Sequence, residues 1–87
     1  MEFSSVRYYE NKINIMLFNK QDFALLYDRI LIRENKKQKY GTQLTFNPES
    51  MKLEPLPVAN TDSVDYFRQI MGLDSLLNYI KSANAIY

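Results

Sequence analysis

The stretch KKQKYGTQLTF, residues 36–46, decides how the rest of the chain is interpreted. Around Gly41, one of only two glycines in the sequence, it gathers four side chains that can form hydrogen bonds: Gln38, Tyr40, Thr42 and Gln43. The pattern then alternates to residue 46, so that one face of an extended chain would carry every second residue: Tyr40, Thr42, Leu44 and Phe46. Because β-branched and aromatic residues suit a pleated surface, residues 38–46 predict a β-strand.

A turn and a second extended segment follow this predicted strand. Residues 47–50, NPES, favour a turn because Pro48 supplies the fixed φ that the second turn position requires. Residues 51–58, MKLEPLPV, alternate again, but Pro55 and Pro57 exclude them from the centre of a sheet. We therefore predict a β-hairpin whose second arm is an edge strand or an extended segment.

Helical periodicity precedes the hairpin. Residues 3–11 predict a short helix, and a second helix begins after Asn19, a favourable N-cap residue. Apolar residues recur along this second helix and predict its buried stripe: Phe23, Leu26, Tyr27, Ile30 and Leu31. Asp28 and Arg29 are predicted to lie opposite that stripe or at its flank. Asn35, which tolerates the left-handed conformation, is predicted to end the helix.

Two more helices are predicted after the hairpin. The first is capped by Thr61 or Asp62 and ends at Gly72, and four apolar residues form its buried stripe: Val64, Phe67, Ile70 and Met71. The second is capped by Asp74 and turns three residues inward: Leu76, Leu77 and Ile80. The length suffices for one domain, so we predict a small single α+β domain over residues 1–87. Its order is two N-terminal helices, a β-hairpin or extended arm, and two C-terminal helices.

The composition argues against several classes of function. The sequence has no cysteine and no histidine, and so it lacks thiolate ligands, the commonest zinc ligand and the commonest general base near neutral pH. We predict no metal and no cofactor. No apolar run approaches the roughly 20 residues of a membrane span, and the N-terminus lacks a signal-peptide pattern, which favours a cytoplasmic protein. The net charge of +1 and the diluted basic run at residues 33–39 do not favour nucleic-acid binding.

A set of short motifs runs through most of the chain. Asp-Arg on a helix is followed by Gln-x-Tyr-Gly-Thr-Gln, a proline-containing arm, Asp-x-x-Arg and a Gly-Leu before the last helix: Asp28, Arg29, Gln38, Tyr40, Gly41, Thr42, Gln43, Pro57, Asp65, Arg68, Gly72 and Leu73. Over residues 20–81 this set resembles a bacterial family of unknown function, number six-six-two-four. The resemblance implies a fold neighbourhood and no activity. It also implies that the chain corresponds to the C-terminal portion of longer members, whose upstream part contains a histidine.

Eight polar residues of these motifs form the candidate site: Asp28, Arg29, Gln38, Tyr40, Thr42, Gln43, Asp65 and Arg68. In a structural interpretation, Gly41 permits a close backbone approach and the polar side chains satisfy backbone groups. In a binding interpretation, the neutral donors converge with Arg29 or Arg68 on a carboxylate, phosphate or peptide group. Catalysis is the least favoured, because only Asp28, Asp65 and tyrosine hydroxyls could supply an acid or base. We predict no catalytic residues.

Asp28 and Arg29 are adjacent and point about 100° apart on a helix, so they cannot pair with each other. If the helix that ends at Gly72 packs on the helix that begins after Asn19, we predict that Asp28 pairs with Arg68 and Arg29 with Asp65. The alternative for Asp65 is a solvated side chain in the first turn of its helix, where the helix dipole favours an acid. The predicted function is a non-catalytic binding or structural module; its partner is unknown, with another protein or a missing N-terminal domain as options. The alternative is a remnant or half of an enzyme whose remaining catalytic groups lie in a missing N-terminal part or a partner subunit.

Overall fold

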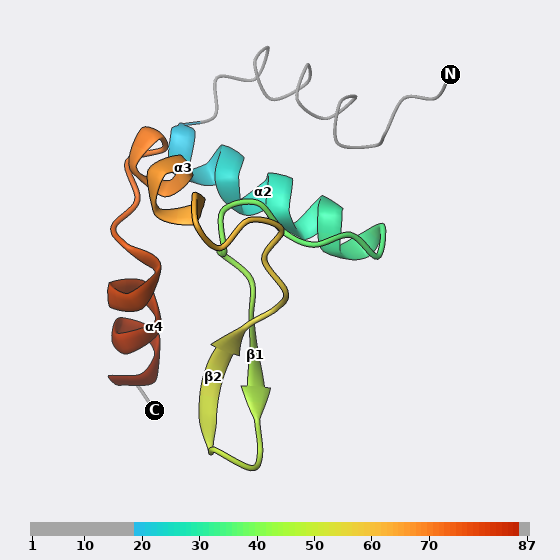
Figure 1. The fold of residues 1–87 in the computed structure, drawn as a ribbon, viewed down its shortest axis with the longest axis vertical. Helices are drawn as coiled ribbons and strands as arrows, with labels where there is room; N and C mark the ends of the chain where they lie inside the picture. The colour runs from blue at the N-terminus through green and yellow to red at the C-terminus, as the bar shows by residue number, and fades with distance from the viewer. Residues whose placement is uncertain (1–18, 86–87) are drawn as a thin grey trace.

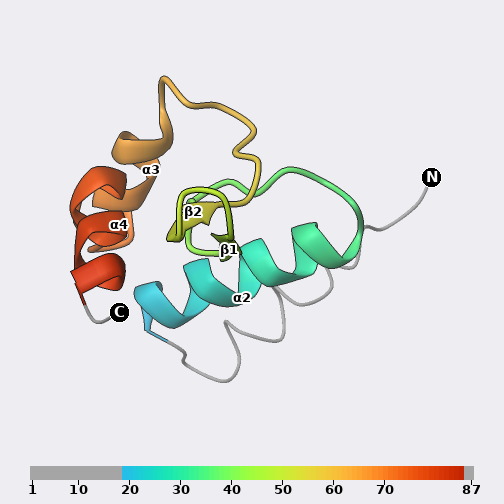
Figure 2. The ribbon, with the colours of Figure 1, turned by 90° about the horizontal axis from the view of Figure 1, so that it is seen from below.

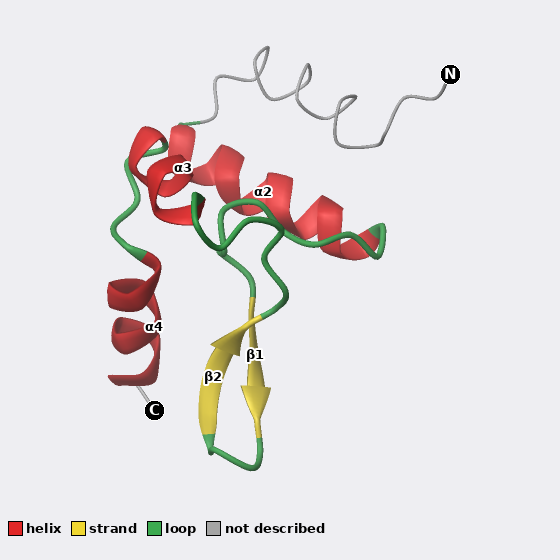
Figure 3. Ribbon diagram, in the orientation of Figure 1, coloured by secondary structure: helices red, strands yellow, loops and turns green. Residues whose placement is uncertain are grey.

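The computed structural model describes residues 19–85. A helix is followed by a β-hairpin and then by two further helices, an order that can be traced in Figure 1 and Figure 3. The elements are α2 (Lys20–Arg33), β1 (Leu44–Asn47), β2 (Lys52–Pro55), α3 (Val64–Ile70) and α4 (Leu76–Ala85). This arrangement confirms the prediction of a small α+β domain. The helix predicted over residues 3–11 lies outside the described residues.

The first described helix, α2, begins and ends where the sequence predicts. The Asn19 side chain accepts a hydrogen bond from the Asp22 backbone N–H at 2.7 Å, which confirms the N-cap. Asn35 follows the helix with a φ of +60°, as predicted for the residue that ends it. The position predicted for Asp28 is wrong, however. Asp28 is completely buried, because the segment after the helix folds back over its position.

The hairpin is shorter than predicted at its first strand. Residues 44–47 pair antiparallel with residues 52–55, and the Glu49 N–H donates to the Asn47 side chain in the turn. The strand prediction for residues 38–43 is wrong. Tyr40, Gly41 and Thr42 are buried one after another, which an alternating strand with one solvent face cannot achieve. Residues 38–43 form a loop instead, and we call it the central loop.

The C-terminal helices follow the predicted order but differ in their caps. Gly72 ends α3 with a φ of +74°, as expected for a glycine after a helix. Thr61 and Asp62 do not cap α3, which begins after Ser63. The Ser75 hydroxyl, not Asp74, accepts a hydrogen bond from the Asn78 N–H at the start of α4, since Asp74 contacts Arg68.

The inward-facing residues of these helices also differ from the prediction. Ile70 and Leu77 are 47% and 62% exposed, so their assignment to the buried stripes is wrong. Val64 is buried as predicted, and the other buried residue of α3 is Arg68. A charged residue therefore takes the core position that apolar periodicity assigned to its neighbours.

The elements surround the central loop. Figure 1 shows α2 and α3 near one end, with the hairpin projecting away from them, and Figure 2 looks along the hairpin between α2 and α4. Helix α4 packs on β2, where the Asn84 amide accepts from the Leu53 N–H at 2.8 Å and donates to the Leu53 carbonyl at 3.1 Å. These two bonds cover the outer edge of β2.

The buried interior is unusually polar. Among residues 19–85 the buried apolar residues are Ala24, Ile30, Tyr40 and Val64, and the buried polar ones are Asp28, Gln38, Thr42 and Arg68. The largest side chains that are fully buried are all polar: Arg68, Gln38 and Asp28. Buried polar groups are costly unless they are hydrogen-bonded, so their partners determine how this fold is held together. No helix within residues 19–85 is long and apolar enough to cross a bilayer.

Candidate functional site

The Asp28 side chain holds the central loop by accepting hydrogen bonds from the backbone N–H groups of the loop. Its Oδ1 accepts hydrogen bonds from the N–H groups of Lys39 and Tyr40 at 2.8 and 3.0 Å. Its Oδ2 accepts from the N–H and the hydroxyl of Thr42 at 2.9 and 2.8 Å. Four donors therefore converge on one carboxyl group that has no exposed surface. This carboxylate is engaged inside the fold.

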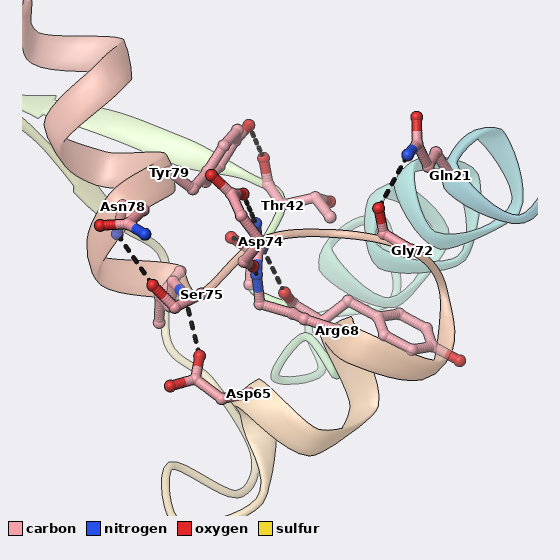
Figure 4. A network of polar contacts seen from close by, with 12 residues as sticks. Gln21, Thr42, Asp65, Arg68, Gly72, Asp74, Ser75, Asn78 and Tyr79 are labelled. Carbon is pink, nitrogen blue, oxygen red and sulfur yellow. Dashed lines mark hydrogen bonds and ion pairs between the residues drawn. The ribbon is translucent and has the colours of Figure 1, made fainter.

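The Arg68 side chain holds the same loop by donating hydrogen bonds to the backbone carbonyl groups of the loop. Its Nη1 donates to the Tyr40 carbonyl at 2.8 Å and lies 3.5 Å from the Gly41 carbonyl. Its Nε donates to the Asp74 carbonyl at 2.6 Å, and its Nη2 pairs with the Asp74 carboxylate at 3.4 Å. The guanidinium also lies over the Tyr79 ring, 4.8 Å from its centroid. Figure 4 shows Arg68, Asp74 and Tyr79 close together between α3 and α4.

Gln38 and Tyr79 satisfy the ends of the loop. The Gln38 amide accepts from the Gln43 N–H at 2.9 Å and donates to the carbonyls of Gln43 and Leu56 at 3.0 and 2.8 Å. The Tyr79 hydroxyl donates to the Thr42 carbonyl at 2.7 Å, a bond visible in Figure 4. We call Asp28, Arg68, Gln38 and Tyr79, with the loop between them, the polar clamp. It supplies partners to backbone groups that a buried loop would otherwise leave unsatisfied.

The predicted ion pairs are wrong. Asp28 does not pair with Arg68, because the backbone of the central loop lies between them: its N–H groups donate to Asp28, and its carbonyl groups accept from Arg68. Asp65 does not pair with Arg29; its Oδ1 accepts from the Leu76 N–H at 2.8 Å, beside the start of α4 (Figure 4). Sequence reasoning also missed Tyr79 as a member of the polar clamp, because nothing in the local pattern of α4 distinguishes it.

The Lys39 side chain also connects the central loop to helices α2 and α3. Its ammonium lies over three aromatic rings, 5.7 Å from the centroid of Tyr27, 5.3 Å from Tyr40 and 4.8 Å from Phe67. Tyr27 and Tyr40 in turn pack edge to face at 5.7 Å. These cation–π contacts bring residues of α2, the loop and α3 together around one charge.

Arg29 stands apart from the polar clamp. Its exposed side chain makes no hydrogen bond or ion pair within residues 19–85. It borders a pocket of about 370 Å³ on the side of α2, lined by Leu26, Arg29, Ile30, Ile32, Arg33 and Gln43. Arg29 and Arg33 are four residues apart and so lie on the same face of the helix. The described lining contains no acidic side chain. We call this the arginine pocket.

A larger groove of about 540 Å³ lies between β2 and α4, and none of the eight predicted residues lines it. The Asn84 amide on its wall is already bonded to the Leu53 backbone. Lys52, Lys81 and Glu54 also line the groove, so charges of both signs meet there. The described residues hold no group of three or more acidic side chains suited to a metal ion.

Comparison with known proteins places the chain in a family. Residues 13–87 match the family of unknown function DUF6624. The chain belongs to this family. No curated protein and no solved structure matches it.

The motifs that resemble DUF6624 separate into two groups in the structure. The buried side chains of Asp28, Gln38, Thr42 and Arg68 hydrogen-bond inside the fold, and Tyr40 is buried among them. Arg29 lies only at the arginine pocket, and Gln43 touches both regions. The motif therefore combines residues that hold the fold of this chain with one cation, Arg29, that has no polar partner in the described part of the chain.

Proposed function

We propose that this DUF6624 domain is a non-catalytic binding module that recognises an anionic group at the arginine pocket. The observation that carries the proposal is the unpartnered guanidinium of Arg29 within residues 19–85, beside Arg33 in a hollow without described acidic residues. Guanidinium groups present planar sets of donors that fit carboxylate and phosphate oxygens. The guanidinium of Arg68, by contrast, already donates hydrogen bonds to the carbonyl groups of Tyr40 and Asp74.

Fixed walls support this proposal, because a rigid site loses less entropy when it binds. Gln43 is held at its N–H and its carbonyl by Gln38, and its amide nitrogen donates to the Thr42 hydroxyl at 2.9 Å. That nitrogen is therefore engaged, and Gln43 acts as a wall of the pocket. Recognition of the anion falls on Arg29 and Arg33.

The alternative function, half of an enzyme, has less support. It would require an acid or base at the mouth of a pocket that several predicted residues line. Of the eight, only Arg29 and Gln43 line the arginine pocket. Asp28 accepts four hydrogen bonds inside the fold, and Asp65 accepts one from Leu76. The binding module therefore remains the preferred proposal.

The proposal is tested by following the arginine Nε–H signals of the full chain in NMR titrations at constant ionic strength. Sodium acetate and sodium phosphate are the probes. We expect saturable shifts at Arg29 and Arg33, and binding at least about tenfold weaker in Arg29→Gln, since a hydrogen bond to a charged group contributes about 1.5–3 kcal/mol.

Lys81→Gln provides the matched control, because it removes one positive charge from an exposed position on α4. It should leave the titration unchanged. The absence of any saturable shift with acetate, phosphate or the organic acids considered below would overturn the proposal. An equal loss in Lys81→Gln would also overturn it, because it would reduce the effect to net charge.

A further inference from the structure

The arginine pocket is amphipathic, which narrows the kind of anion it suits. Three of its lining side chains are aliphatic: Leu26, Ile30 and Ile32. Ile30 is 6% exposed and forms part of the domain's interior, whereas Arg29 and Arg33 are exposed. A ligand that consisted only of charged oxygens would satisfy the guanidinium groups but leave the aliphatic lining against water.

The position of the pocket along α2 favours a single negative charge. Arg33 is in the last turn of the helix, where the unpaired carbonyl groups carry partial negative charge. This end of a helix favours cations and repels anions, and it repels a dianion more strongly than a monoanion. The described pocket has no helix N-terminus among its lining residues, which is the backbone arrangement that commonly binds phosphate.

The size of the pocket favours a small molecule. Its volume of about 370 Å³ falls near the lower end of the roughly 300–1,000 Å³ typical of small-ligand sites. Six described residues line the pocket, so a ligand longer than the pocket would find no further contact with the described part of the chain there. The groove between β2 and α4 shares none of these lining residues.

We infer that the arginine pocket binds a free organic monocarboxylic acid with a compact aliphatic or aromatic body. Arg29 and Arg33 hold its carboxylate, and Leu26, Ile30 and Ile32 contact its hydrocarbon part. This inference rests on the proposed function, since it requires anion recognition by the arginines. It adds a requirement for an apolar body, which that function alone does not make.

The test compares acetate, hexanoate, phenylacetate and inorganic phosphate as ligands of the full chain, each titrated by NMR. Hexanoate and phenylacetate are expected to bind at least about tenfold more tightly than acetate, because more hydrocarbon is removed from water. A carboxylate with an apolar neighbour can also come from the C-terminus of a peptide or protein. A short peptide with a C-terminal leucine represents that source and is expected to bind more weakly than hexanoate.

Two substitutions with equal chemistry separate the apolar contact from a loss of structure. Ile32→Thr should reduce the preference for hexanoate over acetate severalfold and leave acetate binding unchanged. Ile70→Thr, at a partly exposed position of α3 that does not line the pocket, should leave both unchanged. Arg29→Gln should weaken the binding of both acids.

The outcomes distinguish this inference from the proposed function. If acetate or phosphate binds as tightly as hexanoate, the inference is overturned and the proposed function stands. If none of the anions binds, both are overturned. Hexanoate binding that persists in the Arg29→Gln, Arg33→Gln double variant would overturn both, since carboxylate recognition would not be involved. Tighter binding of the peptide would overturn the assignment to a free acid.

Discussion

The polar clamp and the arginine pocket start from adjacent residues of α2 but treat a charged side chain in opposite ways. Asp28 is completely buried and accepts four hydrogen bonds. Arg29 is exposed and has no polar partner within residues 19–85. A buried charge must be satisfied by the fold, whereas an exposed cation can keep its donors for a ligand. Polar residues of one motif can therefore serve stability and binding separately.

Removing the centre of the clamp should have the largest effect. Asp28→Ala leaves three N–H groups and the Thr42 hydroxyl without their acceptor, so we expect the free energy of unfolding to fall by about 3–5 kcal/mol. Urea unfolding measures it. Asp22→Ala is the matched control, because Asp22 is an exposed acid in the first turn of the same helix and should cost less than about 1 kcal/mol. Equal losses would show that Asp28 does not hold the loop.

The guanidinium of the clamp should matter by its shape as well as its charge. Arg68→Lys keeps the charge but cannot reach the Tyr40 and Asp74 carbonyls together, so we expect a loss of about 2–3 kcal/mol in the free energy of unfolding. Arg33→Lys makes the same exchange at the pocket and should change stability by less than about 0.5 kcal/mol. Thermal and urea unfolding of both variants test this contrast. An Arg68→Lys variant as stable as the parent chain would contradict this prediction.

Substitution of Gly41, where the central loop passes close to Leu76, should have the next largest effect on stability. Gly41 has a φ of +69°, and a Cβ there would lie 2.9 Å from Leu76 Cδ1. We expect Gly41→Ala to lower the free energy of unfolding by about 2 kcal/mol, through backbone strain and this contact. Gly72→Ala has a similar φ of +74° but would meet only the Gln21 amide nitrogen at 3.6 Å, so it should cost about 1 kcal/mol. Equal costs in urea unfolding would mean that Leu76 moves aside.

The pocket should give the smallest effect on stability. Arg29→Gln is expected to change the free energy of unfolding by less than about 0.5 kcal/mol, because its side chain has no polar partner in the described part of the chain. Anion binding should weaken in the same variant, as proposed above. Urea unfolding beside the titration sharpens the comparison, since a large loss of stability would place Arg29 in the structural group with Asp28.

Local signals in the sequence predicted much of the fold. Asn19 caps α2, Gly72 follows the end of α3, and the turn around Pro48 joins two paired strands. Each depends on residues a few positions apart, whose conformational preferences act wherever the chain goes. The motif likewise identified Asp28, Gln38 and Arg68 of the polar clamp, but it missed Tyr79 and the partners of all four, and it gave Asp28 and Arg29 equal weight.

The sequence by itself therefore determined the N-cap of α2, the residues that end α2 and α3, the turn, the hairpin and the helical segments between residues 19 and 85. Only the tertiary structure decided that residues 38–43 form a buried loop and that Asp28 lies inside while Arg29 faces a pocket. The physical reason is distance along the chain. Alternation predicts a strand when neighbouring strands supply hydrogen bonds, but here the partners are Asp28, 11 to 14 residues earlier, and Arg68, 27 or 28 residues later. Those long-range bonds satisfy the backbone and override the local pattern.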